Sequence, residues 1–193
     1  AEMYMSYEIR KRGGKAIYIA PMKALAFQKR TDWSNPKHHF HDLNVSICTG
    51  DFRMTQSRVK ELDEADLIVM TPEMLASRCR NQSSEKSNFL KKVGTIVFDE
   101  AQRAWDSSNM LVKKGVSASE PELLIGIGEK IPNWTALVGL IGHGQEIHTG
   151  EEAGIKGWFE AVNSSHAKSD WKIFTPPRFT KDFPDKNVTE FEE

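Results

Sequence analysis

TIVFDEAQ, residues 95–102, is the stretch of this chain that decides the fold. Its first four residues form a mostly apolar run that predicts a buried strand, and Asp99 and Glu100 follow at the strand's end. That position suits Asp99 for holding Mg2+ through water, and Glu100 for orienting and deprotonating an attacking water. A lone Asp-Glu pair more often caps the next helix. The apolar run and the following Ala101-Gln102 favour the metal-dependent interpretation.

The same unit, an apolar run followed by a polar cluster, recurs along the chain. It is found at 16–20, 45–48 and 67–70, and further strand candidates lie at 136–141 and 172–174. Helical patterns separate the strands at 22–30, 72–80, 87–92, 120–131 and 151–162, whereas 105–119 is interpreted as a polar loop. Short buried strands alternating with helices predict an α/β fold, a three-layer parallel sheet. Ligands of such sheets bind at the carboxyl ends of the strands, where we expect the polar clusters to lie.

Four of these clusters resemble helicase motifs. The motifs are IAPMKALAFQ (19–28), TGD (49–51), TPE (71–73) and IVFDEAQ (96–102), which cover about residues 15–105 in the expected order. The chain resembles the superfamily 1 and 2 helicases of the DEAD/DEAH-box type. The resemblance implies a RecA-like P-loop NTPase domain that uses ATP and Mg2+.

The resemblance also implies which residues bind nucleic acid. Helicases hold the sugar-phosphate backbone with amides, hydroxyls, helix N-termini and a few cations. The residues of this chain that fit are Pro21, Lys23, Thr49, Gly50, Thr71 and Pro72. Each motif alone has an ordinary explanation, since Thr-Pro-Glu starts many helices and Thr-Gly-Asp is a common turn. Their joint order favours the helicase interpretation.

Beyond Trp105 the sequence departs from the motif pattern of superfamily 2. Superfamily 2 has Ser-Ala-Thr after the next strand, whereas this chain reads LVGLIGHGQE at 137–146. That ending is closer to superfamily 1, which implies that Gln145, together with Gln102, senses the terminal phosphate of ATP. The DEAQ box and the segment 144–152 resemble bacterial and phage helicase-like proteins with Schlafen-type ATPase domains.

The phosphate loop is missing from the sequence. The nearest string, GGKA at 13–16, lacks the hydroxyl residue, and Ile9 stands where the first glycine belongs. The opening helical pattern also lacks a capping residue. We therefore expect 1–175 to be a RecA-like domain without its first strand and phosphate loop, truncated at the N-terminal side, and 176–193 to be a linker or tail. A second RecA-like domain is an expected partner.

The leading hypothesis is a fragment of an ATP-dependent helicase or translocase whose track is single-stranded or duplex nucleic acid, with DNA favoured over RNA. One alternative is a non-catalytic RecA-like module that binds nucleic acid or protein. Another is the ATPase part of a restriction or defence nuclease. The residues encoded upstream of Ala1 would discriminate the first two, because a phosphate loop there supports the motor.

Composition agrees with a folded domain. The chain is 39% hydrophobic and has a net charge of −1, but residues 1–60 carry 11 basic and 5 acidic side chains, a net of +6. We expect this front part to face an anionic partner. Two cysteines favour a reducing cytoplasm, and no apolar stretch approaches the roughly 20 residues of a membrane span. For His38, His39 and His41 a solvated loop is favoured over a metal cluster.

Overall fold

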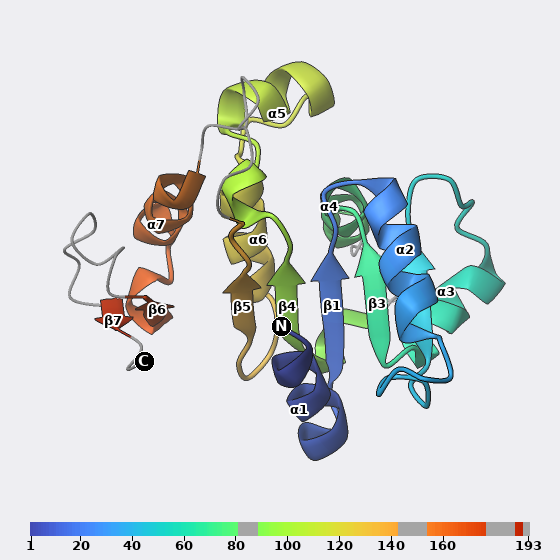
Figure 1. Ribbon diagram of the computed structural model, residues 1–193. Coiled ribbons are helices and arrows are strands. Elements are labelled where there is room, and N and C mark those ends of the chain that lie inside the picture. The colour runs from blue at the N-terminus through green and yellow to red at the C-terminus, as the bar shows by residue number, and fades with distance from the viewer. Residues whose placement is uncertain (81–88, 143–153, 177–187, 191–193) are drawn as a thin grey trace.

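The computed structural model describes residues 1–80, 89–142, 154–176 and 188–190. Five parallel strands form the central sheet in the order β2-β3-β1-β4-β5 (Figure 1). The strands are β1 (Lys15–Ile19), β2 (Val45–Cys48), β3 (Leu67–Met70), β4 (Val93–Phe98) and β5 (Ala136–Gly139). The predicted parallel α/β sheet is confirmed.

Helices cover both faces of the sheet. Helices α1 (Glu2–Arg12) and α2 (Lys23–Trp33) lie on one face. The other face packs against α3 (Gln56–Glu64), α4 (Pro72–Arg80) and α6 (Glu120–Gly128). Short 3-10 turns at Phe89–Lys92 and Ala101–Arg103 flank β4. Helix α7 (Gly154–Ser164) packs beside α6.

Alternation along β1 divides the core into two halves. Ile17 and Ile19 contribute to the core beneath α4 and α6, whereas Ala16 and Tyr18 contribute to the core beneath α1 and α2. All the side chains of β1 are buried, as a strand covered on both faces requires. The α1/α2 side is anchored by Trp33, which is 2% exposed.

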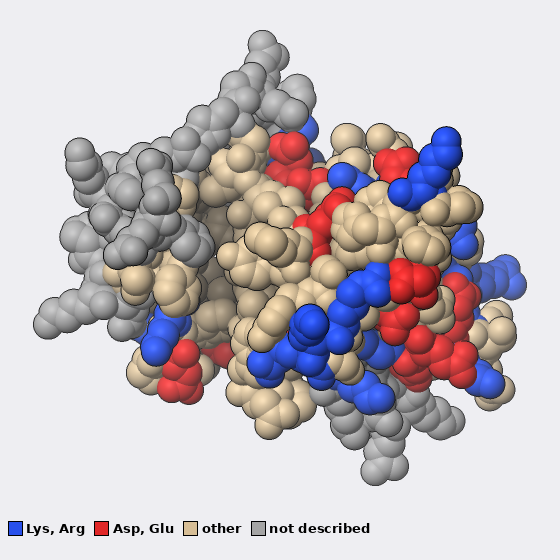
Figure 2. Space-filling model, turned by 60° about the horizontal axis from the view of Figure 1, so that its bottom comes forward, with Lys and Arg blue, Asp and Glu red and all other residues tan. Residues whose placement is uncertain are grey.

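The basic residues of the front part lie at both ends of the sheet, since Lys23 follows β1 at its carboxyl end and others precede β1. Three of them, Arg10, Lys11 and Arg12, form the last turn of α1, which Gly13 ends in the left-handed conformation. This turn precedes β1 and therefore lies at the amino end of the sheet, where Lys and Arg side chains are exposed (Figure 2). Positive charge here complements the helix dipole. The expectation that the net of +6 faces an anionic partner stays a prediction.

Helices α3 and α5 (Ser107–Lys114) and strand β7 (Val188–Glu190) were not among the elements predicted from the sequence. The expected polar loop at 105–119 contains α5, so that prediction was wrong. Near the C-terminus, β6 (Ile173–Thr175) pairs in parallel with β7 as a separate small sheet. The domain boundary at residue 175 stays a prediction. Within the described residues, no helix is both long and apolar enough to cross a membrane.

Candidate functional site

The site residues predicted from sequence follow the carboxyl ends of neighbouring strands. Backbone hydrogen bonds extend the pairing past those ends: Ala20 N donates to Met70 O at 2.9 Å, and Asp99 N donates to Ile19 O at 2.9 Å. Leu140 N likewise donates to Phe98 O at 2.9 Å. The segments after β1, β4 and β5 are thereby held side by side at the carboxyl ends of the strands, next to the last residue of β3.

Asp99 is held in place by a residue from β1. The Tyr18 hydroxyl donates a hydrogen bond to Asp99 Oδ2, and the backbone amide of Glu100 donates to Asp99 Oδ1 at 3.2 Å. Burial and the neighbouring Asp99 raise the pKa of Tyr18 far above its usual range. The Tyr18 hydroxyl therefore remains a donor, and the Asp99 carboxylate is oriented before any ligand binds.

Glu100 has a backbone conformation that is uncommon for a residue with a side chain. Its φ is 54°, in the left-handed region. Its Oε2 accepts a hydrogen bond from Gln102 Nε2 at 2.6 Å, and Gln102 Oε1 accepts one from Gly142 N at 3.2 Å. Gln102 is 7% exposed. This chain of contacts joins the acidic pair to the segment that follows β5.

The turn after Glu100 is anchored to α7 and to β5. The indole of Trp158 donates to Ala101 O at 2.8 Å, and Ala101 N donates to Leu140 O at 2.7 Å. The Trp158 ring also packs edge-on against Phe98, with the centroids 5.3 Å apart. The turn that carries the two acids is therefore fixed from two sides, and Trp158, which is partly buried, packs against the core.

A second group of polar residues lies at the ends of β1 and β2. Lys23 Nζ contacts Asp51 Oδ1 at 2.6 Å, and the Thr49 hydroxyl donates to Asp51 Oδ2 at 3.4 Å. The Lys23 ammonium lowers the pKa of Asp51. Lys23 and Asp51 are about half exposed, so the pair faces solvent.

The other predicted nucleic-acid residues differ in exposure. Gly50 is exposed, with no atom near the place of a Cβ, and Pro21 and Pro72 are partly exposed. Thr49 and Thr71 are 0% and 1% exposed. The Thr71 hydroxyl has no hydrogen-bond partner, so it does not cap α4. The structure thus brings these motifs to one edge but buries both threonines.

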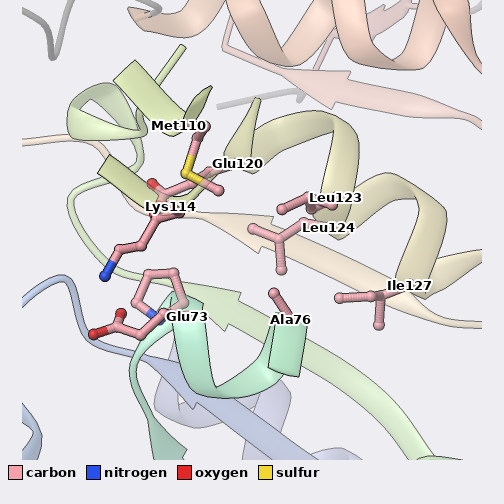
Figure 3. A pocket seen from close by; sticks show the side chains of 9 residues that line it. Glu73, Ala76, Met110, Lys114, Glu120, Leu123, Leu124 and Ile127 are labelled. Atoms are coloured by element: carbon pink, nitrogen blue, oxygen red, sulfur yellow. The ribbon is translucent and has the colours of Figure 1, made fainter. Parts of the chain in front are cut away.

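Two hollows are candidates for a ligand pocket, a small cavity beside α4 and a larger groove beside α1. A cavity of about 20 Å³ between α4, α5 and α6 is lined by Ala76, Leu124 and Ile127, with Glu73 and Lys114 at its rim (Figure 3). It has space for about one water and is mostly apolar. A groove of about 370 Å³ lies between α1 and the start of β5 and includes Tyr7 and Trp134. Neither hollow includes the acidic pair.

Sequence reasoning found the acidic pair but missed its supports. Tyr18 and Gly142 were not predicted as site residues, and Asp51 was noted only as part of a motif. Tyr18 is a polar-tipped side chain within an apolar strand, which is the one signal that pointed to it. Gln145 lies outside the described residues, and its assignment stays a prediction.

A parallel sheet in this order, with an acidic pair after β4 and polar motifs after its neighbours, defines the RecA-like class of α/β domains. The DEAD/DEAH box helicase family matches residues 1–120. The chain belongs to that family.

Curated relatives and solved structures agree with this assignment. ATP-dependent DNA helicase Hel308 of Methanocella arvoryzae is 41% identical over 103 residues, and Hel308 of Pyrococcus abyssi is 34% identical over the same length. Each match covers 52% of this chain and 13% of the relative. The Hef helicase domain of Pyrococcus furiosus superposes with a TM-score of 0.57 at 18% identity, covering 94% of this chain and 37% of that one. This structural likeness concerns the fold.

Proposed function

We propose that residues 1–175 are the first RecA-like motor domain of an ATP-dependent helicase or translocase, which couples ATP hydrolysis to movement on nucleic acid. One observation carries the proposal. The Asp99-Glu100 pair is fixed by Tyr18 and Gln102 at the same sheet edge as the three nucleic-acid motifs. Such an arrangement lets one edge hold both a nucleotide and a polynucleotide.

The acidic pair supplies the chemistry in this proposal. Asp99 positions Mg2+, and Glu100 orients and deprotonates the attacking water. The donor set fits, because Mg2+ takes carboxylate oxygens and retains several waters, and both acids are partly exposed. Gln102, together with Gln145, senses the terminal phosphate of ATP. The contact from Gln102 to the Gly142 amide gives this signal a route toward the segment after β5.

Nucleic acid binds at the ends of β1, β2 and β3 in this proposal. Lys23 contacts phosphate, Gly50 allows close approach, and Pro21, Thr49, Thr71 and Pro72 shape the backbone around them. Phe27 lies one helical turn beyond Lys23, and its ring is 6.1 Å from that of Phe52, with both rings more than a third exposed. Exposed aromatic rings beside a cation favour single strands, whose bases stack on such rings.

The preference for DNA rests on the names of relatives and structural neighbours, and the relationship to Schlafen-type proteins rests on a residue pattern. The relatives named above are called DNA helicases, and MrfA, a structural neighbour with a TM-score of 0.53, was solved bound to DNA. We therefore favour DNA over RNA. The DEAQ box at 99–102 supports a relationship to Schlafen-type helicase-like proteins. The partner of the motor is a second RecA-like domain, and the cytoplasmic location predicted from the cysteine content stays a prediction.

Nucleic-acid-stimulated ATP hydrolysis tests the proposal. We expect the intact protein to hydrolyse ATP faster when single-stranded DNA is added, and Glu100→Gln to abolish hydrolysis while DNA binding persists. The matched control is Glu64→Gln, because Glu64 is an exposed carboxylate on α3. Hydrolysis by Glu100→Gln at the wild-type rate would contradict the assignment.

A further inference from the structure

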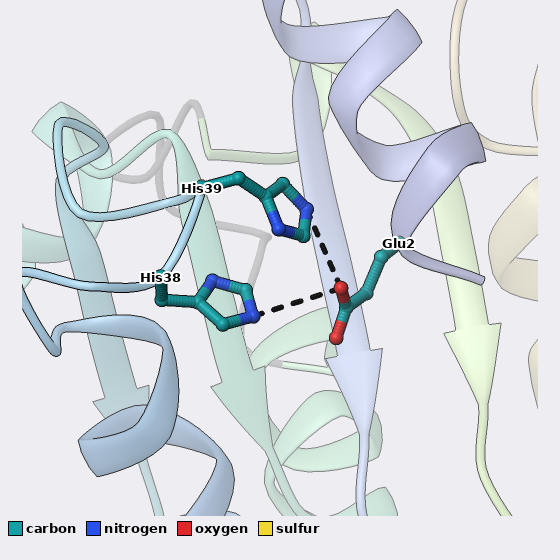
Figure 4. A group of neighbouring side chains, drawn as sticks. All are labelled: Glu2, His38 and His39. Atoms are coloured by element: carbon teal, nitrogen blue, oxygen red, sulfur yellow. Dashed lines mark ion pairs between the residues drawn. The ribbon is translucent and has the colours of Figure 1, made fainter.

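Three side chains outside the acidic pair and its direct contacts converge on one point. Glu2 opens α1, and His38 and His39 lie in the connection between α2 and β2 (Figure 4). His39 Nε2 lies 3.3 Å and His38 Nε2 lies 3.6 Å from Glu2 Oε2. One ligand atom from each residue falls within 4.8 Å of the others. We propose that Glu2, His38 and His39 form a binding site for a zinc-type transition-metal cation.

The donor chemistry selects the kind of cation. Two imidazole nitrogens and one carboxylate oxygen suit Zn2+ and its neighbours, whereas Mg2+ and Ca2+ prefer oxygen alone. Three protein ligands leave a fourth position for water. The site is therefore distinct in chemistry from the Mg2+ position proposed at Asp99.

Surrounding contacts hold the carboxylate and the histidine loop in place. The Trp33 indole donates to Glu2 Oε1 at 3.0 Å, which leaves Oε2 facing the two rings. Hydrogen-bonded partners of this kind orient metal ligands. Arg10 ties α1 to the same loop, because its guanidinium contacts Asp42 at 2.6 Å and donates to His39 O at 2.8 Å.

The buried ring of Phe40 packs against both imidazoles. Phe40 is 0% exposed, and its ring centroid lies 5.4 Å from that of His38 and 4.4 Å from that of His39. The two imidazoles stack with centroids 4.3 Å apart, so both ring edges face Glu2. The lone pair of each Nε2 lies in the plane of its ring, so one of the two stacked imidazoles must turn before both nitrogens bind the same cation.

One hydrogen bond must change when the cation binds. The Phe40 amide donates to His38 Nδ1 at 3.1 Å, so without metal the proton of this ring is on Nε2. A cation on Nε2 displaces that proton to Nδ1, which turns Nδ1 into a donor and releases the Phe40 amide. Metal binding therefore carries a specific signature at the Phe40 amide, which a chance contact with the histidines lacks.

Metal titration of the untagged, chelator-stripped protein tests the site. We expect one Zn2+ per chain by equilibrium dialysis, Co2+ absorption bands typical of nitrogen and oxygen ligands, and a shift of the Phe40 amide resonance on Zn2+ addition. His39→Ala and Glu2→Gln should each weaken Zn2+ binding at least about tenfold. Trp33→Phe, which removes the indole donor but keeps a ring, should weaken it less.

The control is His166→Ala, because His166 is an exposed histidine outside the cluster. It should leave Zn2+ affinity unchanged. Equal Zn2+ affinity in wild type, His39→Ala and Glu2→Gln would overturn the proposal, as would the absence of binding at micromolar Zn2+. Either result would mean that Glu2 and the two histidines form an ion-pair cluster that does not bind metal. Circular dichroism of each variant separates lost ligands from lost folding.

Discussion

The hydroxyl of Tyr18, within β1, donates a hydrogen bond to Asp99 at the end of β4, across 81 positions of sequence. A tyrosine that is 2% exposed thereby orients the carboxylate proposed to hold Mg2+. Burial of the phenol and the Asp99 charge both raise the pKa of Tyr18, which keeps the proton on the hydroxyl. The hydroxyl therefore stays a hydrogen-bond donor to Asp99.

Replacing Tyr18 with phenylalanine tests this relationship. Tyr18→Phe keeps the ring that packs edge-on against Trp33 at 4.9 Å but removes the donor from Asp99. We expect the free energy of unfolding to fall by about 1.5–3 kcal/mol, the usual range for a hydrogen bond to a charged group. Urea denaturation measures the change. The control is Tyr7→Phe, because Tyr7 is 58% exposed. Equal stability of wild type and Tyr18→Phe would show that the contact contributes nothing.

The Lys23–Asp51 ion pair predicts opposite effects of its two partners on DNA binding. Asp51 neutralises the cation that is proposed to contact phosphate, so binding must displace it. Lys23→Ala should weaken single-stranded DNA binding and lower the slope of affinity against salt by about one. Asp51→Asn should strengthen binding by about two- to fivefold, the range of an exposed ion pair.

Fluorescence anisotropy over a range of salt concentrations checks both changes. The matched control is Asp42→Asn, which removes the same charge from an exposed pair with Arg10, a residue of the last turn of α1. It should leave DNA affinity nearly unchanged. Weaker binding by Asp51→Asn would mean that Asp51 supports the interface and does not compete with phosphate.

A buried carboxylate beneath the sheet predicts steric coupling between α1 and β4. Glu8 is 4% exposed, and its carboxyl occupies the space that a Cβ at Gly94 would need. Gly94→Ala should therefore lower the free energy of unfolding by about 1–3 kcal/mol, as overpacking does. Glu8→Ala opens that space, so the double variant should be more stable than the sum of the single effects predicts.

Thermal or urea denaturation of the four proteins in this cycle gives the coupling. Gly126→Ala is the control for glycine replacement, because nothing lies near its Cβ position and it is helical. It should stabilise the protein by about 0.5–1 kcal/mol. Simple additivity of Glu8→Ala and Gly94→Ala would refute the steric explanation.

Local patterns predicted the strands of the central sheet and most helices. A strand that is buried on both faces is a continuous apolar run, which can be recognised in the sequence without knowing the strand it pairs with. The order of the strands could not be obtained this way. Strand β1 lies between β3 and β4, and those pairings join segments about 50 and 80 residues apart. The helix within 105–119 was missed because its polar composition favoured a loop, although typical capping residues stand at both of its ends. Asp106 accepts from Asn109 N at 2.8 Å, and Gly115 ends the helix in the left-handed conformation.

The candidate site likewise contains residues that the sequence predicted and residues that it did not. Asp99, Glu100 and Gln102 are adjacent in sequence, so the motif alone identified them. Their supports, and the meeting of Glu2 with the histidine loop, depend on contacts between distant segments, for which one sequence carries no signal. The histidines were interpreted as a solvated loop because no cysteine is near them in the sequence, and the carboxylate that faces them lies about 36 residues earlier, on α1.

The acidic side of the pH profile should be governed in part by Glu8. Burial raises the pKa of Glu8 above its usual range, and the nearby Arg12 only partly offsets this effect. The folded protein therefore binds this proton more tightly than the unfolded chain does. Stability from this group is present below the unfolded pKa of about 4.3, and it is lost as pH rises through the folded value.

Glu8→Gln removes that titration while nearly preserving shape. We expect the variant to gain stability relative to wild type as pH rises from 4 to 7, by about 1.4 kcal/mol for each unit by which burial raises the pKa. Urea denaturation at several pH values measures the difference. Glu160→Gln is the matched control, since Glu160 and Lys156 form an exposed i,i+4 pair at 3.3 Å, like the Glu8–Arg12 pair at 3.4 Å. A pH-independent difference between Glu8→Gln and wild type would mean that Glu8 carries its charge in the folded protein at no cost.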